Sequence, residues 1–236
     1  MRTLTSLLLL LLIFCQSLLS QNGNSPYEWK WKKDGFWLGG GIAGTALGLS
    51  IIQNKDPFTE VEINKFMSQK DDINFLDKWV VGNYSKKASD ISDIPFFISF
   101  ATPLTLLLDN NINKHTGQFL GMYFESLTTT AALFSITAGL TRRARPYVYN
   151  TTEKSLNSKT TITATRSFYS GHVAATATAC FFAAKVFQDY HPNSTAVPYV
   201  YAGAIILPAT VGYFRMEAGQ HFLTDVLVGY GIGALV

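Results

Sequence analysis

Three short clusters contain the residue types that perform chemistry, and each lies beside an apolar segment. The clusters are the basic run Arg142, Arg143 and Arg145, the run Ser170, Gly171 and His172, and the group Arg215, His221 and Asp225. Guanidinium groups bind the paired oxygens of anions such as phosphate, while imidazoles transfer protons or attack as nucleophiles. The clusters therefore predict a site where histidines act on an anionic group that arginines hold.

The spacing in the third cluster predicts an oriented nucleophile. His221 and Asp225 are four residues apart where the last apolar segment begins, so in a helix both would share one face. Asp225 is then expected to accept a hydrogen bond from one imidazole nitrogen, which leaves the other nitrogen free to attack. Arg215 ends the preceding apolar segment, and a short turn is expected to return the chain beside His221.

The second cluster predicts an anion-binding helix start. Ser170 and Gly171 precede an Ala-rich run, so free backbone N–H groups, a hydroxyl and the positive end of a helix dipole would face an anion. Because glycine has no side chain, it also allows the anion to approach the backbone closely. His172 follows directly, in a position to donate a proton to a leaving oxygen.

Each cluster also has an ordinary structural interpretation. Ser-Gly-His strings are common in loops, a His–Asp pair at this spacing is usually a surface pair, and Arg-Pro commonly ends a helix. All three clusters in one chain, each at an expected helix end, favour the functional interpretation. His115 and His191 lie in polar loops and are expected to be solvated. No metal and no cofactor are expected, because no ligand spacing is present.

The elements that must position these clusters are helices. Apolar segments cover residues 36–52, 94–108, 119–140, 172–187, 197–214 and 222–236, with polar stretches between them. Segments of this length favour helices over strands. We therefore expect an all-α helical bundle with its active site at one end, where antiparallel helices would bring the three clusters together. The bundle is either embedded in a membrane or soluble in the periplasm.

Composition narrows the class of protein. The chain has 236 residues, a size that suits one domain, and 47% of them are hydrophobic. A formal charge of only +3 argues against a nucleic-acid partner, and two cysteines argue against a disulfide framework. Mean hydropathy is +0.14, modest for a chain that lies wholly in lipid.

The chain start predicts export. A basic residue, an apolar run and then small residues indicate a secretory signal peptide over 1–20, with an uncleaved membrane anchor as the alternative. The expected division is then an N-terminal apolar segment and polar helical region over 21–93, followed by a catalytic helical bundle over 94–236.

The three clusters resemble the type 2 phosphatidic acid phosphatase superfamily. That superfamily also contains class A acid phosphatases, undecaprenyl-diphosphate and lipid A phosphatases, and vanadium haloperoxidases. Its pattern is Lys-x6-Arg-Pro, then Pro-Ser-Gly-His, then Ser-Arg-x5-His-x3-Asp, and the likeness runs from about Glu125 to Gly229. The resemblance implies that His221 is the nucleophile, His172 the general acid and Asp225 the partner of His221. It also implies that phosphate is bound by Arg145, Arg215, Ser170 and Gly171.

The chain departs from that pattern at three positions. Ala138 stands where the family has lysine, Tyr169 where it has proline, and Phe214 where it has serine. Arg142 or Arg143 is expected to supply the missing positive charge at the phosphate. The His–His–Asp–Arg set is intact, so activity is expected.

The resemblance implies a phosphatase that acts through a phospho-histidine on a phosphomonoester or diphosphate. The apolar segments favour a membrane and a phosphorylated lipid or isoprenoid diphosphate as substrate. The alternatives are a soluble periplasmic acid phosphatase of broad specificity, a vanadium haloperoxidase and a non-catalytic lipid-binding protein.

The expected location is the inner membrane, with the active site facing the periplasm. If an exported chain start is followed by segments that all span, the clusters fall on the cytoplasmic side. A periplasmic site therefore requires that one segment does not span, and the Gly-rich segment 36–52 is the candidate.

Overall fold

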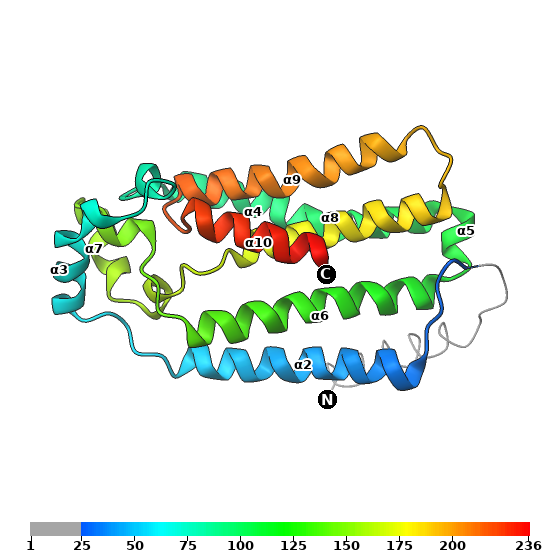
Figure 1. The fold of residues 1–236 in the computed structure, drawn as a ribbon, viewed down its shortest axis with the longest axis horizontal. Coiled ribbons are helices and arrows are strands. Elements are labelled where there is room, and N and C mark those ends of the chain that lie inside the picture. Colours follow the sequence, from blue (N-terminus) through cyan, green and yellow to red (C-terminus); the bar gives the residue numbers. More distant parts are fainter. Residues whose placement is uncertain (1–24) are drawn as a thin grey trace, which may run out of the picture.

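The computed structural model describes residues 25–236, so the expected signal peptide at 1–20 lies outside the described residues. Within the described range the chain forms nine α-helices, joined by loops and short 3-10 helices, and contains no β-strand. The long helices run alongside one another in an elongated bundle (Figure 1). The predicted all-α bundle is confirmed.

Six helices build the body of the bundle. They are α2 (Trp31–Gln53), α4 (Lys86–Ala101), α6 (Thr116–Leu140), α8 (Gly171–Tyr190), α9 (Val197–Glu217) and α10 (Leu223–Leu235). Helix α8 is central, because α4, α6, α9 and α10 all pack against it, whereas α2 packs along α6. The boundary expected at 93/94 falls inside α4, which is a continuous helix across that point.

Helices α2 and α6 lie side by side because small residues line their contact. Gly41 and Gly48 on α2 face Thr128 and Ser135 on α6 so closely that a Cβ on either glycine would overlap its neighbour. Small residues let two helix backbones approach, which is the common way in which helices associate in lipid. The Trp37 Nε1–H donates to Thr129 Oγ1 at 2.9 Å across the same contact.

Three stretches in the described part of the chain are long and apolar enough to cross a membrane: Trp31–Gln53, Lys86–Leu108 and Val197–Glu217. Few of their residues are buried inside the protein, so their apolar side chains face outward. These helices suggest a membrane protein. The segment 36–52, which was the candidate for not spanning, lies within the first of these stretches. Its glycines do not break α2, and instead they allow the helix to pack closely on α6.

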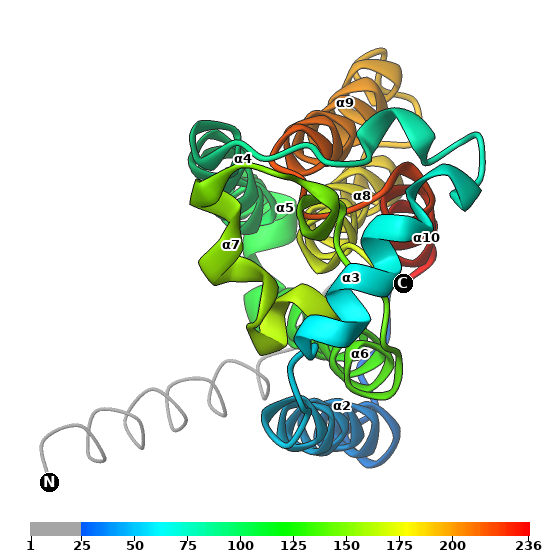
Figure 2. The same cartoon turned by 90° about the vertical axis from the view of Figure 1, so that its left-hand side faces the viewer.

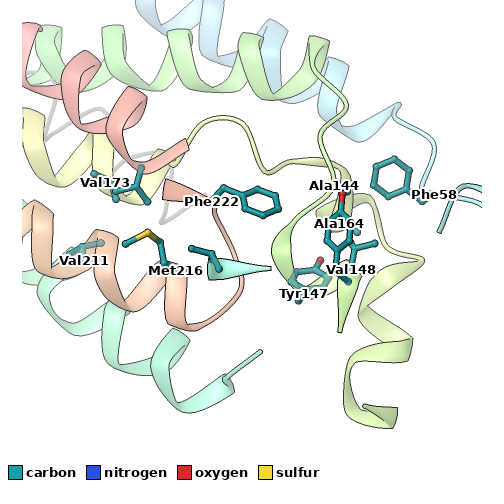
Figure 3. Close-up of a cluster of buried hydrophobic side chains, with 12 residues drawn as sticks. Phe58, Ala144, Tyr147, Val148, Ala164, Val173, Val211, Met216 and Phe222 are labelled. Atoms are coloured by element: carbon teal, nitrogen blue, oxygen red, sulfur yellow. The ribbon is translucent and has the colours of Figure 1, made fainter. Parts of the chain in front are cut away.

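One end of the bundle is covered by short helices and loops. Helix α3 (Glu60–Ser68), helix α7 (Glu153–Lys159) and the 3-10 helix Pro146–Tyr149 lie over the end that Figure 2 faces. Beneath them, a buried apolar cluster includes Phe58, Val148 and Phe222 (Figure 3). This cluster fixes the loops that carry the catalytic candidates against the ends of α8, α9 and α10.

The opposite end holds the two histidines that were expected to be solvated. That expectation was wrong for His115, whereas His191 is partly exposed. His115 is only 5% exposed, because it lies where α6 begins and packs near Tyr190. His191 Nε2 lies 2.7 Å from Asp109 Oδ2, so a carboxylate holds the imidazole. Asp109 also caps the short helix α5 (Asn110–Asn113), and the pair therefore ties two loops together at this end.

Candidate active site

A cavity of about 490 Å³ lies near the loop-covered end of the bundle. Its polar end is lined by two histidines and three arginines, namely His172, His221, Arg145, Arg166 and Arg215. Its other walls carry apolar side chains, including Phe96, Phe100, Leu127, Ala131 and Phe134. Residues from all three sequence clusters therefore meet at one cavity, although they come from different helix ends.

His221 is held in one tautomer by a backbone carbonyl. Its side chain is 2% exposed, and its Nδ1 lies 2.7 Å from the carbonyl oxygen of Ser167. Because a carbonyl only accepts, Nδ1 must carry the proton, which leaves a lone pair on Nε2. Burial, together with the nearby charges of Arg145 and Arg215, holds the pKa of His221 well below its usual value. The imidazole is therefore neutral at ordinary pH.

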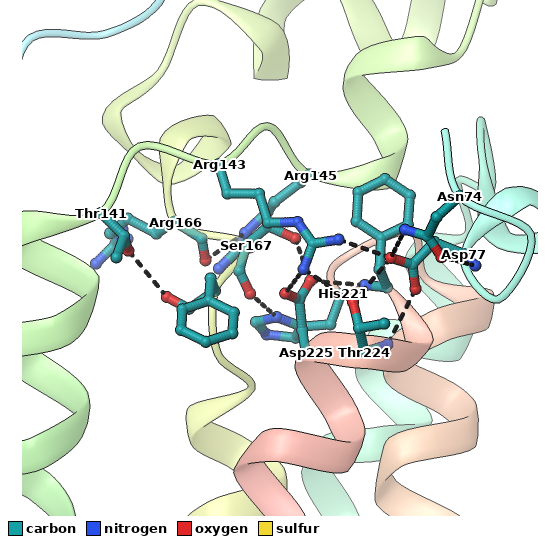
Figure 4. Close-up of polar contacts among 12 residues, drawn as sticks. Asn74, Asp77, Thr141, Arg143, Arg145, Arg166, Ser167, His221, Thr224 and Asp225 are labelled. Carbon is teal, nitrogen blue, oxygen red and sulfur yellow. Dashed lines mark hydrogen bonds and ion pairs between the residues drawn. The ribbon is translucent and has the colours of Figure 1, made fainter. Parts of the chain in front are cut away.

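The predicted direct hydrogen bond between Asp225 and His221 is absent, so that prediction was wrong. His221 lies before α10, whose N-cap is Phe222, and the spacing of helix neighbours does not apply to it. Asp225 Oδ2 instead accepts from Ser167 Oγ at 2.6 Å and from the Phe222 N–H at 2.9 Å. Asp225 thus fixes both chain segments that hold His221, and acts on the imidazole through Ser167 (Figure 4).

Arg143 lies behind Asp225 rather than in the cavity. Its guanidinium forms ion pairs with Asp225 and with Asp77 Oδ2, the latter at 2.7 Å. Asp77 is completely buried and accepts from the Thr224 N–H at 3.0 Å and the Thr224 hydroxyl at 2.8 Å, which places a carboxylate at the first turn of α10. Arg143 therefore joins two carboxylates and positions α10 (Figure 4).

Arg142 is outside the cavity altogether. Its guanidinium lies over the Phe58 ring and pairs with Glu62 of α3 at 3.3 Å, and the side chain is half-exposed. Arg142 and Arg143 have different partners although they are adjacent in the sequence, because successive side chains of an extended segment point to opposite sides. Neither residue is placed where the missing lysine charge was expected.

Ser170 and Gly171 lie at the start of α8, as predicted, but they are used differently. The Ser170 N–H donates to the Asp225 carbonyl at 3.1 Å, and the Ser170 hydroxyl is buried without a hydrogen-bond partner. Gly171 lines the cavity against the Phe134 ring, where a Cβ would lie within 2.7 Å of ring carbon. A glycine is therefore required at the start of α8, because the Phe134 ring occupies the space that a side chain would need.

His172 faces the cavity from the first turn of α8. Its ring packs on Phe96 with centroids 4.2 Å apart, and its Nε2 lies 3.3 Å from Asp93 Oδ1. Arg215 lies beside it, 3.7 Å from the same Asp93 oxygen, and donates to Ser92 Oγ at 3.3 Å. Helix α4 thus supplies the polar neighbours of both His172 and Arg215.

Ala138, which stands at the position of the family lysine, is fully buried on α6. A lysine from another segment, Lys55, lies close to it. Lys55, in the loop after α2, donates from Nζ to the Ala138 carbonyl at 2.9 Å and also to the Thr141 carbonyl. The ammonium group therefore caps the C-terminal end of α6 and does not line the cavity. Burial, with Arg142 and Arg166 nearby, lowers the pKa of Lys55 to about 8.

Sequence reasoning missed Arg166, Ser167, Asp77 and Asp93. Arg166 and Ser167 carried a usable signal, since they lie just before the Ser-Gly-His run. Asp77 and Asp93 carried none, because they reach the site from segments far away in the sequence.

A family model for the PAP2 superfamily matches residues 119–236. The chain belongs to the PAP2 superfamily. Membership implies an enzyme with phosphatase-type activity in general. No curated protein and no solved structure matches the chain. The PAP2 match starts at Phe119, so α2, α3 and α4 lie outside it, although Asp77 and Asp93 contact the residues of the site.

The structure predicts that Asp77 is needed for stability. In an Asp77→Ala variant, Arg143 loses one of its two carboxylates and α10 loses a capping group. We expect the free energy of unfolding to fall by about 3 kcal/mol, the low end for breaking a buried ion pair, because Arg143 is partly exposed. Unfolding followed by circular dichroism in detergent micelles measures the change.

The matched control for this prediction is Asp72→Ala, which removes an exposed carboxylate from the same segment. An Asp77→Ala variant as stable as Asp72→Ala would contradict the role of Asp77.

Proposed function

We propose that this PAP2 enzyme hydrolyses a lipid-linked phosphomonoester or diphosphate through a phospho-histidine on His221. One observation carries the proposal. The Ser167 carbonyl fixes the proton of His221 on Nδ1, and the imidazole lines a cavity together with Arg145 and Arg215. A neutral, desolvated imidazole with its lone pair toward an anion-binding cavity is suited to attack on phosphorus.

In the first step, His221 Nε2 forms a bond to phosphorus and the bond from phosphorus to the leaving oxygen breaks. His172 donates a proton to that oxygen, so the alcohol or phosphate product leaves with this proton on its oxygen. Arg145 and Arg215 hold the non-bridging oxygens of the phosphoryl group, where their charges stabilise the transition state more than water can. Burial and the charges of Arg215 and Arg145 lower the pKa of His172 to about 3, so its imidazole becomes an acid only when the negative charge of the bound phosphate favours the protonated form.

In the second step, water attacks the phosphorus of the phospho-histidine. The now neutral His172 accepts the proton of that water, the nitrogen–phosphorus bond breaks and the electron pair returns to His221 Nε2. Inorganic phosphate leaves, and His172 then returns its proton to the solvent until the next substrate binds. Each group thus ends the cycle in the state in which it began.

The apolar walls of the cavity support a lipid-linked substrate. Phe96 and Phe134 lie next to the polar end, whereas Phe100 and Leu127 lie one and two helical turns further along α4 and α6. A hydrocarbon chain attached to the phosphate would lie between these two helices, where each buried methylene contributes about 0.8 kcal/mol. Outward-facing residues such as Phe97 on α4 support a path that opens beside the lipid.

The mechanism predicts that His221→Ala abolishes turnover. Without the imidazole no phospho-enzyme forms, and the acid-labile label that a phosphorus-32 substrate leaves on the wild-type chain should disappear. His191→Ala is the control, since it removes an imidazole at the opposite end of the bundle. More than a few per cent of the wild-type rate in His221→Ala, with His191→Ala fully active, would contradict the mechanism.

The apolar cavity predicts that the rate depends on chain length. For alkyl phosphates, kcat/KM should rise by about fourfold per added methylene until the chain fills the cavity. Leu127→Asn should flatten this rise, whereas Leu133→Asn should not, because Leu133 is exposed elsewhere on α6. Equal kcat/KM for short and long chains in the wild type would instead indicate an acid phosphatase of broad specificity.

We further propose that the site faces the periplasm. With α2 crossing the membrane, this requires that the end of α2 near Lys30, Lys32 and Lys33 is cytoplasmic, in agreement with the preference of positive residues for that side. The proposal is therefore incompatible with a cleaved signal peptide over 1–20 and takes the uncleaved membrane anchor instead. A cysteine at Asn157, with Cys180→Ala, should react with a membrane-impermeant thiol reagent in intact spheroplasts. Labelling only after lysis would place the site in the cytoplasm.

A further inference from the structure

The arginines near the cavity differ in whether a carboxylate neutralises them. Arg142 pairs with Glu62, Arg143 with two aspartates, and Arg215 lies 3.7 Å from Asp93. Arg145 and Arg166 form no ion pair within the described part of the chain, although both line the cavity. Two adjacent cations without a carboxylate are stable beside a cavity when an anion occupies it.

Arg166 lines the cavity, and one of its buried donors has no partner. Its terminal nitrogen donates to Thr163 Oγ1 at 3.0 Å, while its Nε is buried and has no hydrogen-bond acceptor. Its backbone carbonyl accepts from Arg145 Nε at 3.4 Å, which places the two arginines side by side. An unsatisfied, buried charged donor is costly, so the arrangement requires an acceptor that the protein itself does not provide.

The neighbouring wall of the cavity has no cation of its own. Leu127, Ala131 and Phe134 share one face of α6, and Ala138 continues that face by one turn. Lys55 lies near Ala138, but its ammonium group donates to carbonyl oxygens at the end of α6. Arg166 is therefore the cation that lies between the end of α6 and Arg145.

We propose that Arg166 is a third phosphate-binding arginine, which supplies from the loop before α8 the positive charge that Ala138 cannot supply from α6. With Arg145 it binds the non-bridging phosphate oxygens, opposite Arg215. This inference rests on the proposed function, since it concerns the same phosphate. A purely structural Arg166, which only anchors the loop through Thr163, would affect stability and leave phosphate affinity unchanged.

Equilibrium binding of orthophosphate tests the proposal without turnover. Calorimetry on the purified full chain in detergent should show phosphate binding that is about 10- to 100-fold weaker in Arg166→Ala, as expected for loss of charge-assisted hydrogen bonds. Arg166→Lys should retain part of the affinity, because it keeps the charge but not the forked geometry. Lys87→Ala is the control, since it removes one exposed positive charge from the start of α4.

Equal phosphate affinity in Arg166→Ala and Lys87→Ala would overturn the proposal. If Arg166→Ala fails to fold, Arg166→Gln decides, because it keeps a donor for Thr163 while removing the charge. Adding Ala138→Lys to Arg166→Gln should restore part of the affinity, and no restoration would overturn the idea that the two positions serve one phosphate. A chain that binds phosphate through Arg166 but forms no phospho-enzyme would refute the proposed function alone.

Discussion

The buried carboxylate of Asp225 is the interaction on which the site depends. It accepts from the Ser167 hydroxyl and the Phe222 N–H and pairs with Arg143, so it connects the loop before α8, the start of α10 and the segment after α6. A charge that is fully buried must have all of these partners, because an unsatisfied one would be strongly destabilising. The same contacts place the Ser167 carbonyl at His221 and thereby decide which nitrogen of the imidazole is free.

Support for that carboxylate reaches beyond the PAP2 match. Asp77 lies in the polar region between α2 and α4, yet it shares Arg143 with Asp225 and holds the first turn of α10. Helix α4 similarly places Ser92 and Asp93 against Arg215 and His172. The region before residue 119 is thus part of the same folded unit as the matched residues, and its buried groups belong to the same electrostatic network.

The sequence predicted what local patterns can encode. Apolar runs of helical length gave the all-α bundle, and clusters at the ends of those runs gave the histidines and arginines that meet at the cavity. The His221–Asp225 bond was wrong because the helix begins after His221, a boundary that spacing alone does not define. The roles of Asp77 and Asp93 could not be predicted from the sequence, because an ion pair between residues far apart in the chain produces no local sequence pattern around either residue.

Under the proposed function, helix α4 would contribute to substrate selectivity from outside the PAP2 region. The histidines and cavity-lining arginines come from the PAP2 region, whereas Phe96 and Phe100, which form one apolar wall of the cavity, come from α4 outside it. Phe96 touches both parts, because its ring also packs on His172. Changes at Phe100 would therefore alter which molecules fit while sparing the reaction, and changes at Phe96 would couple the two. Under that proposal, substrate range would diverge through a single helix while the proposed reacting groups stay the same.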